Sequence, residues 1–245
     1  MKRIVDIAGS LFGLLVFSPI LIVVTYLVWR QDHENPFYIA PRTGLGEKVF
    51  KMLKLRSMIK NADKSGVDST SSTDMRITPI GAVIRRYKLD EISQLWNVLL
   101  GDMSLVGPRP NVKRETDLYT EQERQLLTVR PGITDFSSIV FSDEGAILEG
   151  KPDADLAYNQ LIRPWKSRLG LFYIKNQSIA LDFALVGLTV VAIVSRPTAL
   201  KAVTKILEKM SAPPELTEVA SRTCTLIPFP PPGMDTIVTS RASEQ

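Results

Sequence analysis

The stretch from residue 7 to residue 29 constrains the fold most, because it holds 23 residues without a charge. A helix of this length is long enough to cross the hydrocarbon core of a bilayer. It is not typical of a signal peptide, since the apolar run is too long and no small-residue cleavage site follows it. The simplest interpretation is one membrane-spanning helix.

Two features of this stretch favour a different arrangement. Ser18 and Pro19 lie at its middle, and a proline inside a helix removes a backbone hydrogen bond and bends the helix. Basic residues flank both ends, namely Lys2, Arg3 and Arg30. Positive charge favours the cytoplasmic side, so both ends would stay on one face of the membrane. A re-entrant helix broken at Ser18-Pro19 and a kinked span both remain open from these residues.

A second helix is predicted around residues 85–100. Apolar residues recur there at helical spacing, at Leu89, Ile92, Leu95, Trp96, Leu99 and Leu100. Asp90 and Glu91 then fall in the first turn, where free N–H groups and the helix dipole favour negative charge. Acidic residues at a helix start are ordinary in themselves. With Arg85 and Lys88 close by, however, a carboxylate here is also held ionised and ready to act as a nucleophile.

The composition limits which side chains can act in catalysis or bind a metal. Cys224 and His33 are the only cysteine and the only histidine, so cysteine-based zinc sites and disulfides within the chain are excluded. Catalysis is therefore expected to use carboxylates, and a metal would be oxygen-ligated, such as Mg²⁺. The net charge of +4 suits anionic lipids or phosphorylated substrates. No nucleic-acid-binding module is visible, and we expect no nucleic-acid partner.

The remaining segments give a mixed but mostly helical pattern. Residues 37–58 predict a hairpin of short strands with its turn at residues 44–46. Residues 61–74 predict a mobile loop that could serve as a lid. Residues 153–175 predict a helix, and the apolar residues 183–195 predict an interfacial or core helix too short to span. Proline-rich residues 211–245 predict a disordered tail that is dispensable for catalysis. The fold class is mostly α with a few short strands (α+β).

A long ordered run carries a family resemblance. Residues 89–110 read LDEISQLWNVLLGDMSLVGPRP, and a second match, RPGIT, occupies residues 130–134. This pattern resembles the bacterial sugar transferases called monotopic phosphoglycosyl transferases, over about residues 1–200. The resemblance implies transfer of a sugar phosphate from a nucleotide diphosphate sugar to a polyprenyl phosphate at the membrane. It also implies a re-entrant anchor rather than a span.

The same resemblance assigns roles to residues. Asp90 is expected to be the nucleophile, and Glu91 the second catalytic residue and the Mg²⁺ ligand. Phosphate-binding side chains are expected from Arg109, Arg85, Lys54, Arg56 and Arg130. Arg109 stands between two prolines that limit its backbone freedom. Sequence alone leaves open which of the two adjacent carboxylates is the nucleophile.

Three positions depart from the family pattern. Ala40 stands where relatives commonly carry Gln, which puts any contact of that Gln in doubt. Lys88 replaces a Ser that would cap the helix, at a cost of about 1 kcal/mol. Residues 135–138 read DFSS where relatives continue with Gly, in a region expected to shape the nucleotide or sugar pocket.

These inferences predict an anchor over residues 1–30, a catalytic domain over residues 31–205 and a tail over residues 211–245. The expected reaction transfers a sugar 1-phosphate from a UDP-sugar to undecaprenyl phosphate and releases UMP, through a covalent phosphosugar on Asp90. It would be the first membrane step of a glycan pathway such as exopolysaccharide or O-antigen synthesis, at the cytoplasmic face of a bacterial inner membrane. Expected partners also include anionic phospholipid and a second copy in a homodimer. The alternatives are a membrane glycosyltransferase that releases UDP and a non-catalytic scaffold.

Overall fold

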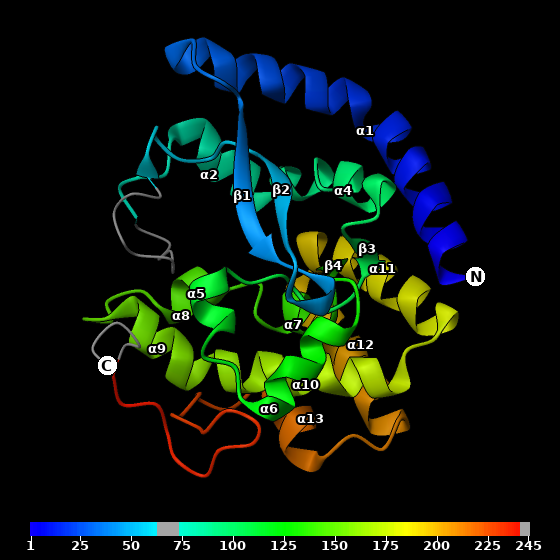
Figure 1. Ribbon diagram of the computed structural model, residues 1–245, viewed down its shortest axis with the longest axis vertical. Helices are drawn as coiled ribbons and strands as arrows, with labels where there is room; N and C mark the ends of the chain where they lie inside the picture. The colour runs from blue at the N-terminus through cyan, green and yellow to red at the C-terminus, as the bar shows by residue number, and fades with distance from the viewer. Residues whose placement is uncertain (63–73, 241–245) are drawn as a thin grey trace.

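The computed structural model describes residues 1–62 and 74–240, so the predicted loop at residues 61–74 lies largely outside the described residues. Most of the chain is helical, and the strands are short, which confirms the α+β prediction (Figure 1). The strands are β1 (Phe37–Thr43), β2 (Val49–Leu55), β3 (Ser104–Val106) and β4 (Gly132–Thr134). The helices are α1 (Lys2–Asp32), η1 (Leu45–Glu47), α2 (Pro79–Arg86), α3 (Leu89–Ile92), α4 (Leu95–Leu100), α5 (Lys113–Thr116), α6 (Glu121–Arg124), η3 (Gln125–Thr128), α7 (Phe136–Val140), α8 (Glu144–Ile147), α9 (Ala154–Leu161), α10 (Arg163–Asn176), α11 (Ile179–Val194), α12 (Arg196–Lys209) and α13 (Pro214–Ser221).

Helix α1 runs along the outside of the molecule and changes direction along its length (Figure 1). The helix is continuous from Lys2 to Asp32 with Pro19 inside it, so Ser18 and Pro19 do not end the helix, and the re-entrant arrangement stays a prediction. Pro19 has no N–H for the carbonyl of Leu15, and the Ser18 hydroxyl donates to that carbonyl instead, at 2.8 Å. The backbone therefore continues as a helix through the proline.

The surface of α1 is compatible with membrane association. The helix is long and apolar enough to cross a bilayer, and only 6% of its most apolar window is buried in the protein. Its N-terminal end is fixed to the body by polar contacts. Arg3 donates to the carbonyls of Val98 and Leu99 in the last turn of α4, and buried Asp6 accepts from the Ser104 hydroxyl at 3.0 Å.

Two short sheets place the loops that surround the site. Strands β1 and β2 pair antiparallel from Phe37↔Leu55 to Thr43↔Val49, with η1 in the turn, which confirms the predicted hairpin. Strands β3 and β4 pair in parallel. Beyond them, Gly107 and Gly132 come so close that a Cβ on Gly132 would lie 2.1 Å from the Gly107 nitrogen. Only glycine permits this contact, which holds the two family motifs together.

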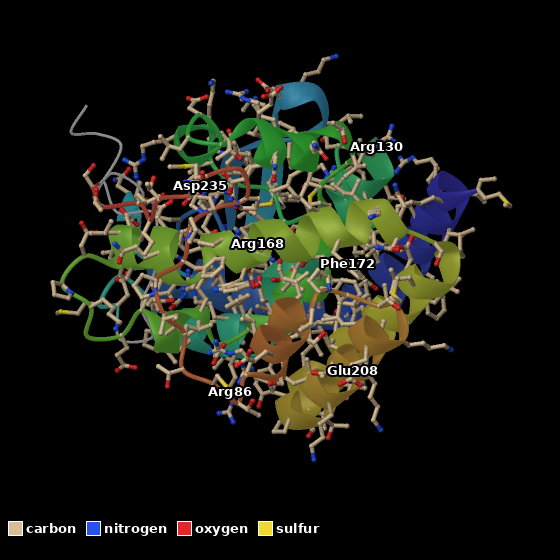
Figure 2. All side chains as sticks on the ribbon, turned by 90° about the horizontal axis from the view of Figure 1, so that it is seen from below. Arg86, Arg130, Arg168, Phe172, Glu208 and Asp235 are labelled. Carbon is tan, nitrogen blue, oxygen red and sulfur yellow. The ribbon has the colours of Figure 1, made fainter. Side chains whose placement is uncertain are left out.

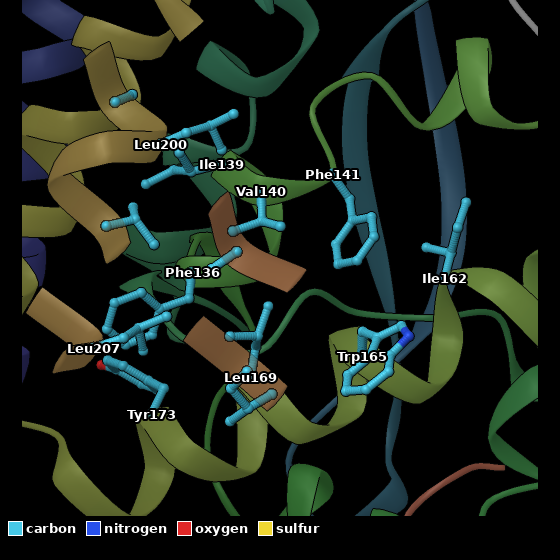
Figure 3. Close-up of a cluster of buried hydrophobic side chains, with 14 of the residues drawn as sticks. Phe136, Ile139, Val140, Phe141, Ile162, Trp165, Leu169, Tyr173, Leu200 and Leu207 are labelled. Atoms are coloured by element: carbon cyan, nitrogen blue, oxygen red, sulfur yellow. The ribbon is translucent and has the colours of Figure 1, made fainter. Parts of the chain in front are cut away.

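The main hydrophobic core forms around α7. This helix contacts α10, α11 and α12, and Figure 3 shows Phe136 of α7 near Leu207 of α12 and Ile139 of α7 near Leu200 of α12. The predicted helix at residues 153–175 is two helices, since α9 ends at Leu161 and α10 begins at Arg163 with Pro164 in its first turn. The predicted apolar helix at residues 183–195 is confirmed as α11.

The expectation of a disordered tail is wrong for residues 211–240. Helix α13 buries Leu216 and Ala220, and the Phe229 ring packs on the Trp165 indole with centroids 4.5 Å apart. Proline loses little conformational entropy when it is ordered, so a proline-rich segment needs few contacts to become fixed. Residues 241–245 lie outside the described residues.

Candidate active site

The acidic pair Asp90-Glu91 lies in the first turn of α3, as predicted. Lys88 precedes the helix in a left-handed conformation with φ 54°, and no side chain caps this end, as the missing Ser predicted. The predicted helix is divided into α3 and α4. The Asn97 side chain fixes α4 to β2, since it accepts from the Leu53 N–H at 2.8 Å and donates to the Lys51 carbonyl at 2.7 Å. The hairpin thereby determines where the carboxylates point.

These carboxylates line a cavity of about 600 Å³. Its cationic lining consists of Arg42, Lys54, Arg85, Arg86, Lys88, Arg109 and Lys166. Its other wall is formed by α7, α8 and the residues between them, including Ser137, Ser138, Asp143 and Glu144. Cations thus gather around two carboxylates in a cleft large enough for a small phosphorylated ligand.

Asp90 faces Lys54 of β2. The Lys54 ammonium lies 3.2 Å from a carboxylate oxygen of Asp90, and the two side chains are 21% and 13% exposed. Burial lowers the pKa of the Lys54 ammonium, and the nearby Asp90 charge partly offsets this. The ion pair holds the Asp90 side chain at the surface of the cavity.

Glu91 is held by a stronger set of contacts. Arg109 donates to one of its oxygens at 2.9 Å, and the Lys88 ammonium lies 3.9 Å from the other. Burial alone would raise the pKa of the Glu91 carboxyl. The charges of Lys88, Arg109 and Lys54 outweigh burial, so this pKa is lowered. Glu91 is therefore ionised at neutral pH.

Arg109 lies where the proline-flanked motif predicts it, beside the acidic pair. Burial lowers the pKa of its guanidinium, but the charges of Glu91 and Asp90 raise it, and the net pKa is above the ordinary value. Arg85 also lines the cavity and donates to the Ser57 hydroxyl at 3.2 Å. Of the five expected phosphate ligands, the cavity thus includes Arg109, Arg85 and Lys54.

Arg56 lies next to the cavity but is engaged elsewhere. Its guanidinium donates to both oxygens of Asp32 at 2.6 Å, which fixes the C-terminal end of α1 to β2. It lines a neighbouring cavity of about 570 Å³, which shares Lys54, Arg85 and Asp90 with the first.

Arg130 is not part of this site. Its Nε donates to the Gly101 carbonyl at 2.8 Å, and it lines a separate cavity of about 260 Å³ with Lys2 and Arg3. Figure 2 shows Arg130 on one side of the molecule and Arg86, which lines the main cavity, on another. A short motif match does not determine which cavity the arginine side chain lines.

Sequence reasoning missed Gln94. This side chain is 1% exposed, lines the main cavity, and its Nε2 has no hydrogen-bond partner among residues 1–62 and 74–240. A buried donor without a partner costs free energy unless a ligand supplies an acceptor. Gln94 follows Asp90 by four residues. In a continuous predicted helix this spacing puts both side chains on one face, and it is the sequence signal that could have identified Gln94.

Residues 135–138, where the sequence departs from the family pattern, form part of the cavity wall. Asp135 is buried and caps α7 by accepting from the Ser138 N–H at 2.7 Å. It also accepts from the hydroxyls of Ser137 and Ser138, at 2.8 Å each. Lys88 reaches the Ser138 carbonyl at 3.4 Å. Two of the family departures therefore meet at one edge of the cavity.

A Mg²⁺ ion fits this site in one binding mode. Within the described ranges no group of three or more His, Cys, Asp or Glu side chains is arranged to hold a metal. Mg²⁺ commonly binds through one or two carboxylates together with substrate phosphates. Asp90 and Glu91 supply the carboxylates for such a shared site, and the surrounding cations favour the phosphates.

Comparison with known proteins gives consistent matches. The chain is 31% identical over 193 residues to the UDP-N-acetylgalactosamine-undecaprenyl-phosphate N-acetylgalactosaminephosphotransferase of Aeromonas hydrophila, covering 78% of this chain and 43% of that protein. It is 38% identical over 208 residues to the exopolysaccharide production protein PSS of Rhizobium leguminosarum bv. phaseoli, covering 80% and 96%. It is 34% identical over 196 residues to the undecaprenyl-phosphate glucose phosphotransferase of Komagataeibacter xylinus, covering 77% and 35%. The chain thus spans less than half of the length of the first and third of these relatives.

The family comparison covers the anchor helix and the whole acidic and cationic cleft. Residues 1–196 match the family model described as bacterial sugar transferase. Since this match extends over most of the chain and includes every residue that lines the cavity, the chain belongs to the bacterial sugar transferase family.

Proposed function

We propose that this protein transfers a sugar 1-phosphate from a UDP-sugar to undecaprenyl phosphate and releases UMP. The observation that carries the proposal is the adjacent pair Asp90-Glu91 among the cations of the main cavity. The relatives named above as phosphotransferases act with undecaprenyl phosphate, but their names give different sugars. The proposal therefore leaves the sugar open.

In the first step a carboxylate oxygen of Asp90 attacks the β-phosphorus of the UDP-sugar. The bond between this phosphorus and the oxygen that bridges the two phosphates breaks, and its electron pair leaves with UMP. The sugar phosphate is then linked to Asp90. Lys54, which lies 3.2 Å from Asp90, holds this carboxylate at the cavity before the attack.

In the second step an oxygen of undecaprenyl phosphate attacks the same phosphorus. The bond to Asp90 breaks, the carboxylate is restored, and an undecaprenyl diphosphate sugar leaves. Arg109 and Gln94 are proposed to donate to phosphate oxygens as negative charge moves between them. Glu91 would hold a Mg²⁺ ion, which would supply positive charge beside the phosphates.

The acceptor is a lipid, so the site must meet the membrane. We propose that α1 enters and leaves one leaflet of a bacterial inner membrane and keeps the cleft at the cytoplasmic face, beside anionic phospholipids. The basic residues at both ends of α1 and the exposed apolar side chains along it support this topology.

The test is an assay of nucleotide release with a panel of UDP-sugars and undecaprenyl phosphate. We expect UMP, and UDP would instead support a glycosyltransferase. Incubation with the UDP-sugar but no acceptor should leave a phosphosugar adduct, which peptide mass spectrometry locates. An adduct on Glu91 would reverse the two roles, and failure to trap any adduct, with turnover only when both substrates are bound, would favour direct transfer.

The variant Asp90→Asn keeps the shape of the side chain and removes the nucleophile. We expect turnover to fall by several orders of magnitude while the protein stays folded. Asp117→Asn, which removes an exposed carboxylate paired with Lys113, is the matched control and should leave turnover unchanged. Full turnover in Asp90→Asn would support a scaffold or a different nucleophile.

A further inference from the structure

One wall of the main cavity is formed by residues 141–144, which are the short link after α7 and the first residue of α8. All four of its residues line the cavity. Its backbone forms consecutive hydrogen-bonded turns, from the Phe141 N–H to the Ser137 carbonyl and from the Glu144 N–H to the Phe141 carbonyl. These local bonds set its shape, and side chains from other helices fix it against the body.

Arg196, at the start of α12, provides the first support. It donates to the Val140 carbonyl and to the Ser142 hydroxyl, both at 3.0 Å. It also lies 2.8 Å from a carboxylate oxygen of Asp143. This arginine is the last residue of the family match.

Arg222 provides the second support, from outside the family match. It follows α13 in a left-handed conformation with φ 56°, which turns the chain toward the cavity wall. Its guanidinium donates to the other oxygen of Asp143 at 3.2 Å and lies over the Phe141 ring at 5.5 Å. Asp143 is therefore held between two arginines from different helices.

The burial of Arg222 argues that its charge matters. Its Nε and Nη1 are buried and have no hydrogen-bond partner in the part of the chain that the structure describes. An apolar side chain of similar size would fill this position without burying those donors. The contribution of arginine at this position is therefore its positive charge beside the Asp143 carboxylate.

The segment that carries Arg222 is itself fixed to the body. The Arg168 guanidinium lies over the Phe229 ring at 4.8 Å and donates to the Pro230 carbonyl at 2.8 Å. Thr120 donates to the Pro232 carbonyl at 2.5 Å, and Gln160 to the Val238 carbonyl at 2.7 Å. In Figure 2 the chain near Asp235 runs beside α10 close to Arg168. The segment crosses the body and is held at several points along its length.

We propose that residues 211–240 act as a clasp that positions the 141–144 wall of the substrate cavity, with Arg222 as the positioning residue. The clasp sets how well the wall fits the donor substrate and takes no part in bond making. The effect of the clasp on the KM for the UDP-sugar rests on the proposed function, because that KM exists only if the protein uses a UDP-sugar.

The test compares Arg222→Met, which keeps bulk without charge, with Arg222→Lys, which keeps the charge. Lys201→Met, at an exposed lysine of α12, is the control. The measurements use the full chain in detergent. We expect Arg222→Met to raise the KM for the UDP-sugar about 3- to 10-fold and to leave kcat within about 2-fold of wild type. This size of effect corresponds to the loss of one partly exposed charged hydrogen bond. Arg222→Lys should restore most of the KM, and Lys201→Met should not change it.

Amide hydrogen exchange gives a readout that does not need activity. Exchange in a peptide covering residues 141–145 should speed up in Arg222→Met, and return toward wild type in Arg222→Lys, with α4 unaffected. Unchanged KM and exchange in a folded Arg222→Met would overturn the proposal. Equal defects in the Met and Lys variants would overturn it too, since charge would then be irrelevant.

Two further outcomes are distinguishable. If Arg222→Met does not fold, Asp143→Asn removes the ion pairs of both Arg222 and Arg196 and should raise exchange at residues 141–145, whereas wild-type exchange would refute the clasp. If the wild type releases no UMP from any UDP-sugar, the proposed function fails, and the exchange comparison still decides the clasp.

Discussion

Replacing Arg109 by Met tests the electrostatics of the site most directly. The variant keeps an unbranched side chain and removes the donor that lies 2.9 Å from Glu91. Breaking a fully buried ion pair costs about 3–5 kcal/mol, and an exposed pair contributes about 1 kcal/mol or less. Glu91 is 10% exposed but Arg109 is 31% exposed, and Lys88 still faces the carboxylate. We therefore expect the free energy of unfolding to fall by about 1.5–3 kcal/mol.

The direction in which the free energy of unfolding of this variant changes with pH can be worked out from Glu91. In the wild type the pKa of Glu91 is lowered from its ordinary value of 4.5, so the stability that this carboxylate contributes is present above that value. It is lost only as the pH falls through the lowered pKa. Without Arg109, burial is opposed by fewer charges and the pKa of Glu91 rises. The stability that Glu91 contributes should therefore be smaller in the variant, and its loss in acid should be complete at a higher pH.

The measurement is denaturant unfolding in detergent at pH values from 3 to 7, taken together with turnover. Under the proposed function, loss of this phosphate donor should lower kcat/KM about 10²- to 10³-fold. Arg124→Met is the matched control, because Arg124 forms an exposed ion pair with Glu47, at 2.5 Å with exposures of 46% and 56%. The reasoning would be refuted if Arg109→Met matched the control in stability and showed no shift in its acid transition.

Two other predictions follow from contacts elsewhere in the chain. Arg163 and Glu123 form a bidentate ion pair with exposures of 4% and 0%, so Arg163→Met should lower the free energy of unfolding by about 3–5 kcal/mol; a loss below about 1 kcal/mol in denaturant unfolding would contradict this. Pro19→Ala restores the N–H that the Leu15 carbonyl lacks, so the helix should straighten and some molecules should span the membrane. Labelling of an N-terminal tag in spheroplasts measures this, and equal labelling of wild type and variant would count against a bend set by the proline.

The sequence by itself determined the features that depend on neighbouring residues. The apolar stretch with Pro19 predicted a long exposed helix, and helical spacing with two acidic residues predicted the position of Asp90 and Glu91. The glycines at residues 44–46 predicted the hairpin turn. Periodicity and turn chemistry act within a few residues, so each of these signals is complete in the local sequence.

Only the tertiary structure decided how distant charges pair. Sequence reasoning named Arg56, Arg109 and Arg130 as phosphate ligands, yet the first binds Asp32 and the third binds a backbone carbonyl. Likewise, nothing near Arg222 in the sequence announces its contact with Asp143, 79 residues away, or the packing of the proline-rich segment. The reason is physical. An arginine can reach many acceptors, and which one it meets depends on how the helices pack, a global property that no local pattern contains.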